Sequence, residues 1–213
     1  MALKAPPTPV APAWSWTGFY IGAEGGYGWG TSNQSFTGLG GGTTGNYNIS
    51  GGAGGGTVGF NYQFDPRWVL GLEGDFSASS IKGSTLSSAT YGCGTVCTSN
   101  VRWYDTFRGR LGYSINNVLL YGTGGLAYGR LDTSFGTGIP GVVSNDRSGW
   151  TAGAGLEYGF APHWSAKLEY LFVDFKSFNW TNAGGCAGLN CTVNDRFNEV
   201  RAGINYNFGS LLH

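Results

Sequence analysis

Charged residues are scarce in this sequence. They make up 11% of its 213 residues, against about 25% in an ordinary soluble domain. A soluble all-β protein of this size has a large wetted exterior, which lysine and glutamate usually supply. The formal net charge is zero, so electrostatics gives no reason to expect nucleic acid or an acidic partner. Composition therefore argues against an ordinary soluble domain.

Long apolar runs and histidines are scarce as well. No window reaches the roughly 18 consecutive apolar residues of a membrane-spanning helix, which excludes a helical membrane protein. The two histidines, His163 and His213, lie in a predicted turn and at the last position. No Ser/His or His/carboxylate arrangement is expected, and the glycine runs lack the lysine of a phosphate-binding loop. We expect neither an enzyme nor a cofactor.

The four cysteines form two close pairs, Cys93 with Cys97 in CGTVC and Cys186 with Cys191 in CAGLNC. Each pair lies in a glycine-rich stretch that we predict to be free of strands and flexible enough to bring the sulfurs together. Two local disulfides in an oxidising compartment are expected. The alternative is a four-thiolate zinc site that joins both stretches, although neither pair has the usual spacing of two residues.

Alternating apolar side chains are abundant where charge is not. Residues 163–175 read HWSAKLEYLFVDF, with apolar residues at every second position and Lys167 and Glu169 on the opposite face. In a soluble barrel the apolar face would form the core and the charges would meet water. In an outer-membrane barrel the apolar face meets lipid and the charges point into the lumen. The remainder of the chain distinguishes these two possibilities.

The same alternation recurs in eight segments, predicted as strands at 17–29, 53–64, 68–79, 102–114, 118–130, 148–160, 164–175 and 197–208. Three joins are tight turns at 65–67, 115–117 and 161–163. The other four joins are long and rich in Gly, Ser, Thr and Asn, at 30–52, 80–101, 131–147 and 176–196. Tight and long joins alternate strictly, so all the long ones fall at one end of a meander.

This layout predicts an all-β fold, an eight-stranded antiparallel up-and-down transmembrane β-barrel with long extracellular loops and short periplasmic turns. The barrel should occupy residues 16–208. We interpret residues 1–15 as a flexible proline-rich segment and residues 209–213 as a C-terminal extension.

Aromatic residues gather near both ends of the predicted strands, as in girdles at the two membrane interfaces. The predicted girdle residues are Trp29, Phe64, Trp68, Phe76, Trp103, Tyr113, Tyr128, Trp150, Phe160, Trp164, Phe172 and Phe208. Three charged residues of the apolar face, Asp105, Arg130 and Asp174, lie beyond the girdle at the long-loop end. We interpret them as marking the outer edge of the bilayer.

The opposite face carries many small residues and ten large charged ones. Because eight strands enclose only enough space for side chains, these charges should pair with one another in the lumen. The predicted lumen charge network is Glu24, Glu73, Asp75, Arg108, Arg110, Glu157, Lys167, Glu169, Glu199 and Arg201.

Four stretches, WTGFYIGAEGGYGWG (16–30), LLYGTGGLAYG (119–129), GLEYGF (155–160) and VRAGINYNF (200–208), together resemble the small outer-membrane porin family of alphaproteobacteria, also called outer membrane immunogenic or RopB-like proteins. The resemblance implies an OmpA-type eight-stranded barrel in the outer membrane of a Gram-negative bacterium, exposed as a surface antigen. It also implies that some relatives bind hemin. GSLLH follows Phe208, whereas such barrels usually end on an aromatic residue.

The function expected is structural and surface-exposed: envelope integrity and contacts through the loops, with a lumen plugged by charges. Two alternatives stay open, a small or gated diffusion porin and a hemin-binding surface receptor. The expected partners are outer-membrane lipid and lipopolysaccharide, the barrel-assembly machinery during biogenesis, and possible host or envelope contacts of the loops. No nucleic-acid partner is expected.

Overall fold

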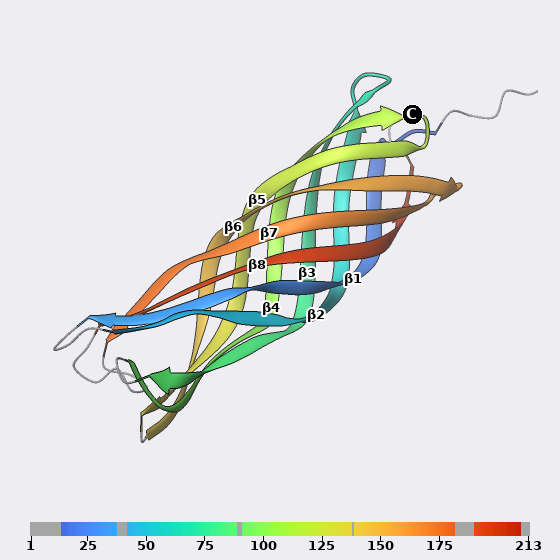
Figure 1. Cartoon of the computed structure of the whole chain (residues 1–213). Helices are drawn as coiled ribbons and strands as arrows, with labels where there is room; N and C mark the ends of the chain where they lie inside the picture. Colours follow the sequence, from blue (N-terminus) through green and yellow to red (C-terminus); the bar gives the residue numbers. More distant parts are fainter. Residues whose placement is uncertain (1–13, 38–41, 89–90, 138, 182–189, 210–213) are drawn as a thin grey trace, which may run out of the picture.

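A computed structural model describes residues 14–37, 42–88, 91–137, 139–181 and 190–209. It is a closed barrel of eight antiparallel strands in chain order, in which β8 pairs with β1 (Figure 1). The strands are β1 (Gly18–Thr37), β2 (Gly42–Gln63), β3 (Trp68–Ser88), β4 (Tyr91–Ile115), β5 (Val118–Thr137), β6 (Ile139–Ala161), β7 (Trp164–Thr181) and β8 (Asn190–Asn207). The predicted eight-stranded antiparallel barrel is confirmed. Within these ranges, no helix has the length and apolarity needed to cross a membrane.

Three tight turns join β2 to β3, β4 to β5 and β6 to β7, as predicted, and they lie at one end of the barrel, here called the turn end. Asn116 and His163 have positive φ angles of 55° and 68°. These residue types enter the left-handed region more readily than most, which suits two-residue connections. In the first turn the Asp65 side chain accepts a hydrogen bond from the Arg67 amide at 3.0 Å.

The outward face of the barrel wall is apolar. Leu126 is 68% exposed and Leu168 49%, while their strand neighbours of opposite parity point inward. On β7 the inward residues Ser165, Lys167 and Glu169 are buried. An apolar exterior around a charged interior is the arrangement of a barrel that meets lipid, and it excludes the soluble alternative.

The strands extend well beyond their predicted limits at the end opposite the turns, here called the far end. The stretches 30–52, 80–101, 131–147 and 176–196 were predicted as long loops, and most of their described residues belong to paired strands. Cys97 lies in β4 and Cys191 in β8, so the prediction of strand-free cysteine stretches was also wrong. Ser, Thr and Asn were interpreted as loop formers, but the hydrogen bonds of a β-ladder join backbone groups and can form whatever the side chains are.

Polarity inverts where the strands leave the apolar belt. On β7, Phe172 points outward among the aromatics, Asp174 points outward beyond it, and Val173 and Phe175 are buried inside. A buried apolar cluster, called the far-end core below, fills the barrel at this level. It contains Tyr47, Ile49, Ile81, Val101, Tyr104, Ala127, Leu131, Val173, Phe175 and Phe197. This part of the wall therefore has the inside-apolar pattern of a water-soluble barrel.

Irregular pairing accompanies this inversion. The register shifts between Ala78 and Ile81 on β3, between Val101 and Trp103 on β4, and between Phe175 and Phe178 on β7. A bulge adds a residue to one strand and redirects the side chains beside it. At β4 it lets Val101 enter the core while Trp103 stays on the outer wall.

Trp16 is buried inside the turn end of the barrel. It is 1% exposed, and its indole Nε1 donates a hydrogen bond to Ser114 Oγ at 2.9 Å. Trp14 lies edge-on to it, with ring centroids 5.5 Å apart. Residues 1–13 and 210–213 lie outside the described part of the chain, so the assignments of the two terminal segments stay predictions.

Candidate functional site: the barrel interior

The ten charged residues predicted to share the lumen are all buried in the barrel. They come from β1, β3, β4, β6, β7 and β8, each with the inward parity of its strand. We call this set, Glu24, Glu73, Asp75, Arg108, Arg110, Glu157, Lys167, Glu169, Glu199 and Arg201, the charge cluster.

Arg108 of β4 contacts three carboxylates. Its Nη2 lies 2.5 Å from Glu73 Oε1 and 2.8 Å from Asp75 Oδ2, and its Nη1 lies 2.9 Å from Glu169 Oε1. Glu73 and Asp75 belong to the neighbouring strand β3, whereas Glu169 belongs to β7, which does not pair with β4. The ion pairs of Arg108 therefore cross the barrel interior.

Arg201 of β8 makes a second set of crossing contacts. Its Nη1 lies 2.5 Å from Glu24 Oε1 and 3.2 Å from Asp75 Oδ1, and its Nη2 lies 2.7 Å from Glu169 Oε1. Lys167 adds an ion pair of 2.7 Å between its Nζ and Glu24 Oε2. Shared carboxylates thus link β1, β3, β4, β7 and β8 in one network.

Arg110 binds at the side of the cluster nearer the turn end. Its Nη2 lies 2.8 Å from Glu157 Oε2, and its guanidinium carbon lies 3.9 Å from the ring centroid of Tyr121. Tyr20 accepts a hydrogen bond of 3.0 Å from Arg110 Nη1 and donates one of 2.6 Å to Glu73. Such hydrogen bonds offset part of the desolvation cost of burying charge.

The buried tyrosines of the cluster were not predicted. Tyr20, Tyr104 and Tyr121 all have inward parity, and that parity was the available signal. Glycine makes room for two of them. A Cβ on Gly59 would overlap the Tyr20 hydroxyl, and one on Gly155 would lie 2.6 Å from the Tyr121 hydroxyl. The glycines of the inward face therefore seat large side chains in a narrow barrel.

Glu199 is bound differently from the other carboxylates. Tyr104 donates a hydrogen bond of 2.6 Å to its Oε2, and among the described residues no cation lies within ion-pair distance of it. With six carboxylates and four basic side chains, the cluster has two more acidic than basic groups.

Apolar side chains lie in the interior on both sides of the charge cluster. Near the turn end, Trp16, Val69, Leu119 and Tyr121 form a buried group. The far-end core covers the other side. The inward face was predicted to carry small and charged residues, so neither apolar layer was predicted from the sequence. Charge-filled and apolar layers thus succeed one another along the barrel axis.

A further polar group lies beyond the far-end core. Arg147 Nη1 is 2.7 Å from Asp195 Oδ2, and both side chains are buried. Gln34 Nε2 donates a hydrogen bond of 2.8 Å to the Tyr47 hydroxyl, which donates one of 3.0 Å to Ser99 Oγ. Sequence reasoning missed these contacts because it placed the residues in loops, where inward parity has no meaning.

The twelve predicted girdle residues lie on the outer wall, in one ring near the turn end and another near the far end. Edge-on and tilted contacts join neighbours within each ring. Trp68 and Tyr113 have centroids 5.3 Å apart at the turn end, and Trp150 and Phe172 are 5.3 Å apart at the far end. Aromatic side chains favour the interface between hydrocarbon and headgroups, so the two rings delimit the apolar belt.

Cys97 and Cys191 are disulfide-bonded, which excludes a four-thiolate zinc site. The side chains of Cys93 and Cys186 lie outside the described part of the chain, so the pairing of Cys93 with Cys97 and of Cys186 with Cys191 stays a prediction. Among the described residues, no group of three or more His, Cys, Asp or Glu side chains could hold a metal ion.

A closed barrel with a lipid-facing belt, two aromatic rings and buried charges defines an integral membrane β-barrel protein. Residues 1–208 match the family model described as "Outer membrane protein beta-barrel domain". The chain belongs to this family of outer-membrane proteins, and its location is the bacterial outer membrane.

The chain is 36% identical to the 31 kDa outer-membrane immunogenic protein of Brucella melitensis biotype 1, covering 96% of this chain and 89% of that protein. It is 32% identical to a 22 kDa outer membrane protein of Rhizobium leguminosarum bv. viciae, covering 94% of this chain and 82% of the relative. The crystal structure of the outer membrane protein OprG from Pseudomonas aeruginosa has a TM-score of 0.50 at 16% identity, with 91% of this chain and 97% of that chain covered. This last likeness concerns the fold alone.

Proposed function

We propose that the protein is a structural outer-membrane barrel with a closed lumen, whose far end is presented at the cell surface. The observation that supports this proposal is the succession of layers inside the barrel. Arg108 and Arg201, with their crossing ion pairs, occupy the level of the apolar belt. The apolar clusters on either side of these ion pairs support a lumen without a continuous hydrated path for ions.

The surface role rests on the position of the far end. There the outer wall becomes polar while the interior is a buried apolar core, which is the arrangement expected of a section that lies in water. Relatives named as immunogenic outer-membrane proteins support the same role. We propose that outer-membrane lipid and the barrel-assembly machinery are its partners in the envelope, that the far end mediates surface contacts, and that the protein is not an enzyme.

Planar-bilayer recording tests the closed lumen. The purified, folded protein should show no steady ohmic conductance, whereas an open porin incorporated under the same conditions should. Heat-modifiable gel mobility of the same sample confirms that the barrel is folded. A large, steady conductance from the unmodified protein would show an open lumen and favour the diffusion-porin alternative.

The hemin-receptor alternative has a separate test, a spectral titration of the folded protein with hemin. We expect no saturable shift of the Soret band, because His163 lies in a turn at the end opposite the surface-exposed one. A saturable shift at equimolar hemin would favour the receptor alternative.

A further inference from the structure

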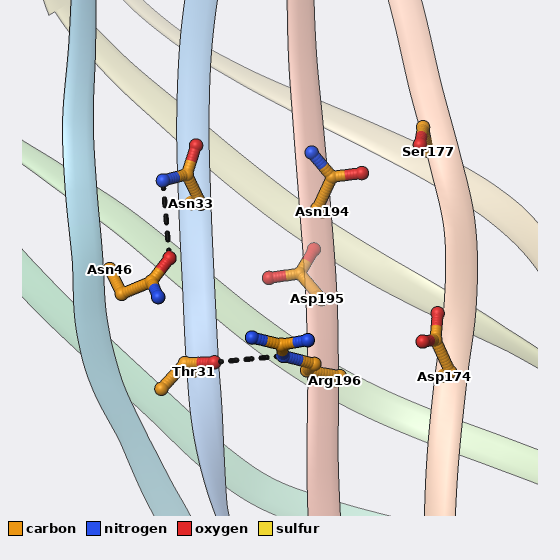
Figure 2. Close-up of a pocket in the computed structure, with 8 residues that line it drawn as sticks. All are labelled: Thr31, Asn33, Asn46, Asp174, Ser177, Asn194, Asp195 and Arg196. Carbon is orange, nitrogen blue, oxygen red and sulfur yellow. Dashed lines mark hydrogen bonds between the residues drawn. The ribbon is translucent and has the colours of Figure 1, made fainter.

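A polar groove of about 410 Å³ lies on the outer wall at the far end (Figure 2). Its side chains come from β2, β1, β8 and β7, and cross-strand pairing arranges most of them in two adjacent rows. One row is Asn46, Asn33 and Asn194, and the next is Thr31, Arg196 and Asp174.

The groove begins directly above the far aromatic ring. The next row toward the membrane pairs Trp29 with Asn198 and Asn198 with Phe172. Trp29 and Phe172 are girdle residues of the outer wall. An amphipathic molecule in the outer leaflet would therefore have its chains beside these rings and its headgroup at the groove.

Arg196 is the cation of the groove. It is exposed, and its Nε donates a hydrogen bond of 3.4 Å to Thr31 Oγ1 (Figure 2). Among the described residues no carboxylate lies within ion-pair distance of its guanidinium, and Asp174, its partner in register, is likewise without an ion pair. A guanidinium with free donors matches the geometry of a phosphate group.

The remaining lining suits hydroxyl groups. Asn33 donates a hydrogen bond of 3.2 Å to Asn46, and Asn194 is exposed beside them. Side-chain amides both donate and accept hydrogen bonds, and the Asp174 carboxylate accepts them, as the hydroxyls of a sugar require. The second carboxylate of the lining, Asp195, is buried and paired with Arg147. One exposed cation among amides, hydroxyls and the Asp174 carboxylate favours a phosphorylated sugar over a simple anion.

Resting on the proposed placement of the far end at the cell surface, we propose that this groove binds the phosphorylated saccharide headgroup of a glycolipid in the outer leaflet. Arg196 binds the phosphate, Asn33 and Asn194 bind sugar hydroxyls, and the acyl chains lie against Trp29 and Phe172. Other basic side chains of the outer wall, such as Lys82 on β3, lie away from the groove and are not required.

The test measures the Kd of the folded full-length protein in detergent for three probes, a purified rough lipopolysaccharide, its deacylated phosphorylated oligosaccharide, and phosphatidylglycerol. Arg196→Gln should weaken binding of the lipopolysaccharide by about 10-fold or more, as expected for a lost hydrogen bond to a charged group. Asn194→Ala should weaken it by a few-fold. Lys82→Gln, which removes an equal charge elsewhere on the same wall, should leave it unchanged. Circular dichroism and heat-modifiable mobility show that each variant is folded.

Equal losses of lipopolysaccharide affinity in Arg196→Gln and Lys82→Gln would show that general surface charge accounts for the binding, and would overturn the site. Binding of phosphatidylglycerol with the same sensitivity to Arg196→Gln would overturn the role of the saccharide. Oligosaccharide binding as tight as that of the intact glycolipid would overturn the membrane source of the ligand. The proposal requires weak oligosaccharide binding and phosphatidylglycerol binding that is insensitive to Arg196. None of these outcomes depends on whether the lumen conducts.

Discussion

Glycine has different roles on the two faces of this barrel wall. Adjacent residues of β5 show the contrast. A Cβ on Gly125, which points inward, would overlap the Phe107 carbonyl oxygen and lie 2.7 Å from Arg108 Cα. A Cβ on Gly124, which points toward lipid, would meet no atom closer than Thr151 O at 3.6 Å. Composition alone gives the number of glycines, and strand parity separates those needed for close approach from those that are not.

These two glycines give a matched pair of substitutions. Gly125→Ala should lower the free energy of unfolding by about 1 to 3 kcal/mol, because the methyl group forces the backbone apart. Gly124→Ala should leave it unchanged or raise it by up to about 1 kcal/mol, because alanine restricts the unfolded chain. Urea unfolding in lipid vesicles measures both. Equal destabilisation by the two variants would contradict the assigned orientation of this strand.

A substitution of Arg108 tests the charge cluster, again at the scale of a single residue. Arg108→Ala removes one of the two arginines that contact Glu73, Asp75 and Glu169, in a cluster that already has more acidic than basic groups, so we expect a loss of about 3 to 5 kcal/mol in the free energy of unfolding. Arg67→Ala removes an equal charge from an exposed turn, where it donates a hydrogen bond to the Tyr113 hydroxyl. The control should change stability by no more than about 0.5 kcal/mol. A loss at Arg108 no larger than at Arg67 would show that water reaches the cluster freely.

At the scale of the strand, sequence reasoning predicted one end of every element well and the other end poorly. The turn-end limits follow from turn residues such as Asn116 and Pro162 beside apolar alternation. The far-end limits were wrong because alternation there has inverted polarity. Asp174 beside Phe175 carried that signal, with an outward charge next to an inward apolar residue. The inversion can be found in the sequence only when the alternation of inward and outward positions is continued past charged outward residues such as Asp174.

The inversion predicts a conventional core outside the membrane. Phe197 is 0% exposed, and its ring centroid lies 5.4 Å from that of Tyr104. Phe197→Ala should therefore lower the free energy of unfolding by about 3 to 5 kcal/mol. Leu126→Ala on the lipid-facing wall creates no interior cavity and should cost less. Denaturant titration of both variants in the same vesicles compares them, and a larger loss at Leu126 would contradict the far-end core.

At the scale of the whole molecule, the ring closure and the identities of the charged interior residues could be predicted from the sequence, because both follow from strand parity and join length. Which carboxylate binds which cation could not, since the contacts of Arg108 and Arg201 cross the barrel between strands that do not pair. The groove around Arg196 could not be predicted either, because locating it requires the register of four strands. The alternation along each strand determines which residues face inward and which face outward. The closed barrel determines which of the inward residues contact one another.

The measurement that tests the central claim most directly is a folding titration of charge placed at two depths of β7. Leu168 is 49% exposed in the middle of the apolar belt, and Asp174 lies on the same face two residues beyond Phe172, in register with Trp150 of the far ring. Leu168→Arg should lower the folding free energy into lipid vesicles by about 2 to 4 kcal/mol, and Asp174→Arg by no more than about 1 kcal/mol. Equal costs, or a larger cost at Asp174, would contradict a wall that faces lipid in its middle and water at its far end.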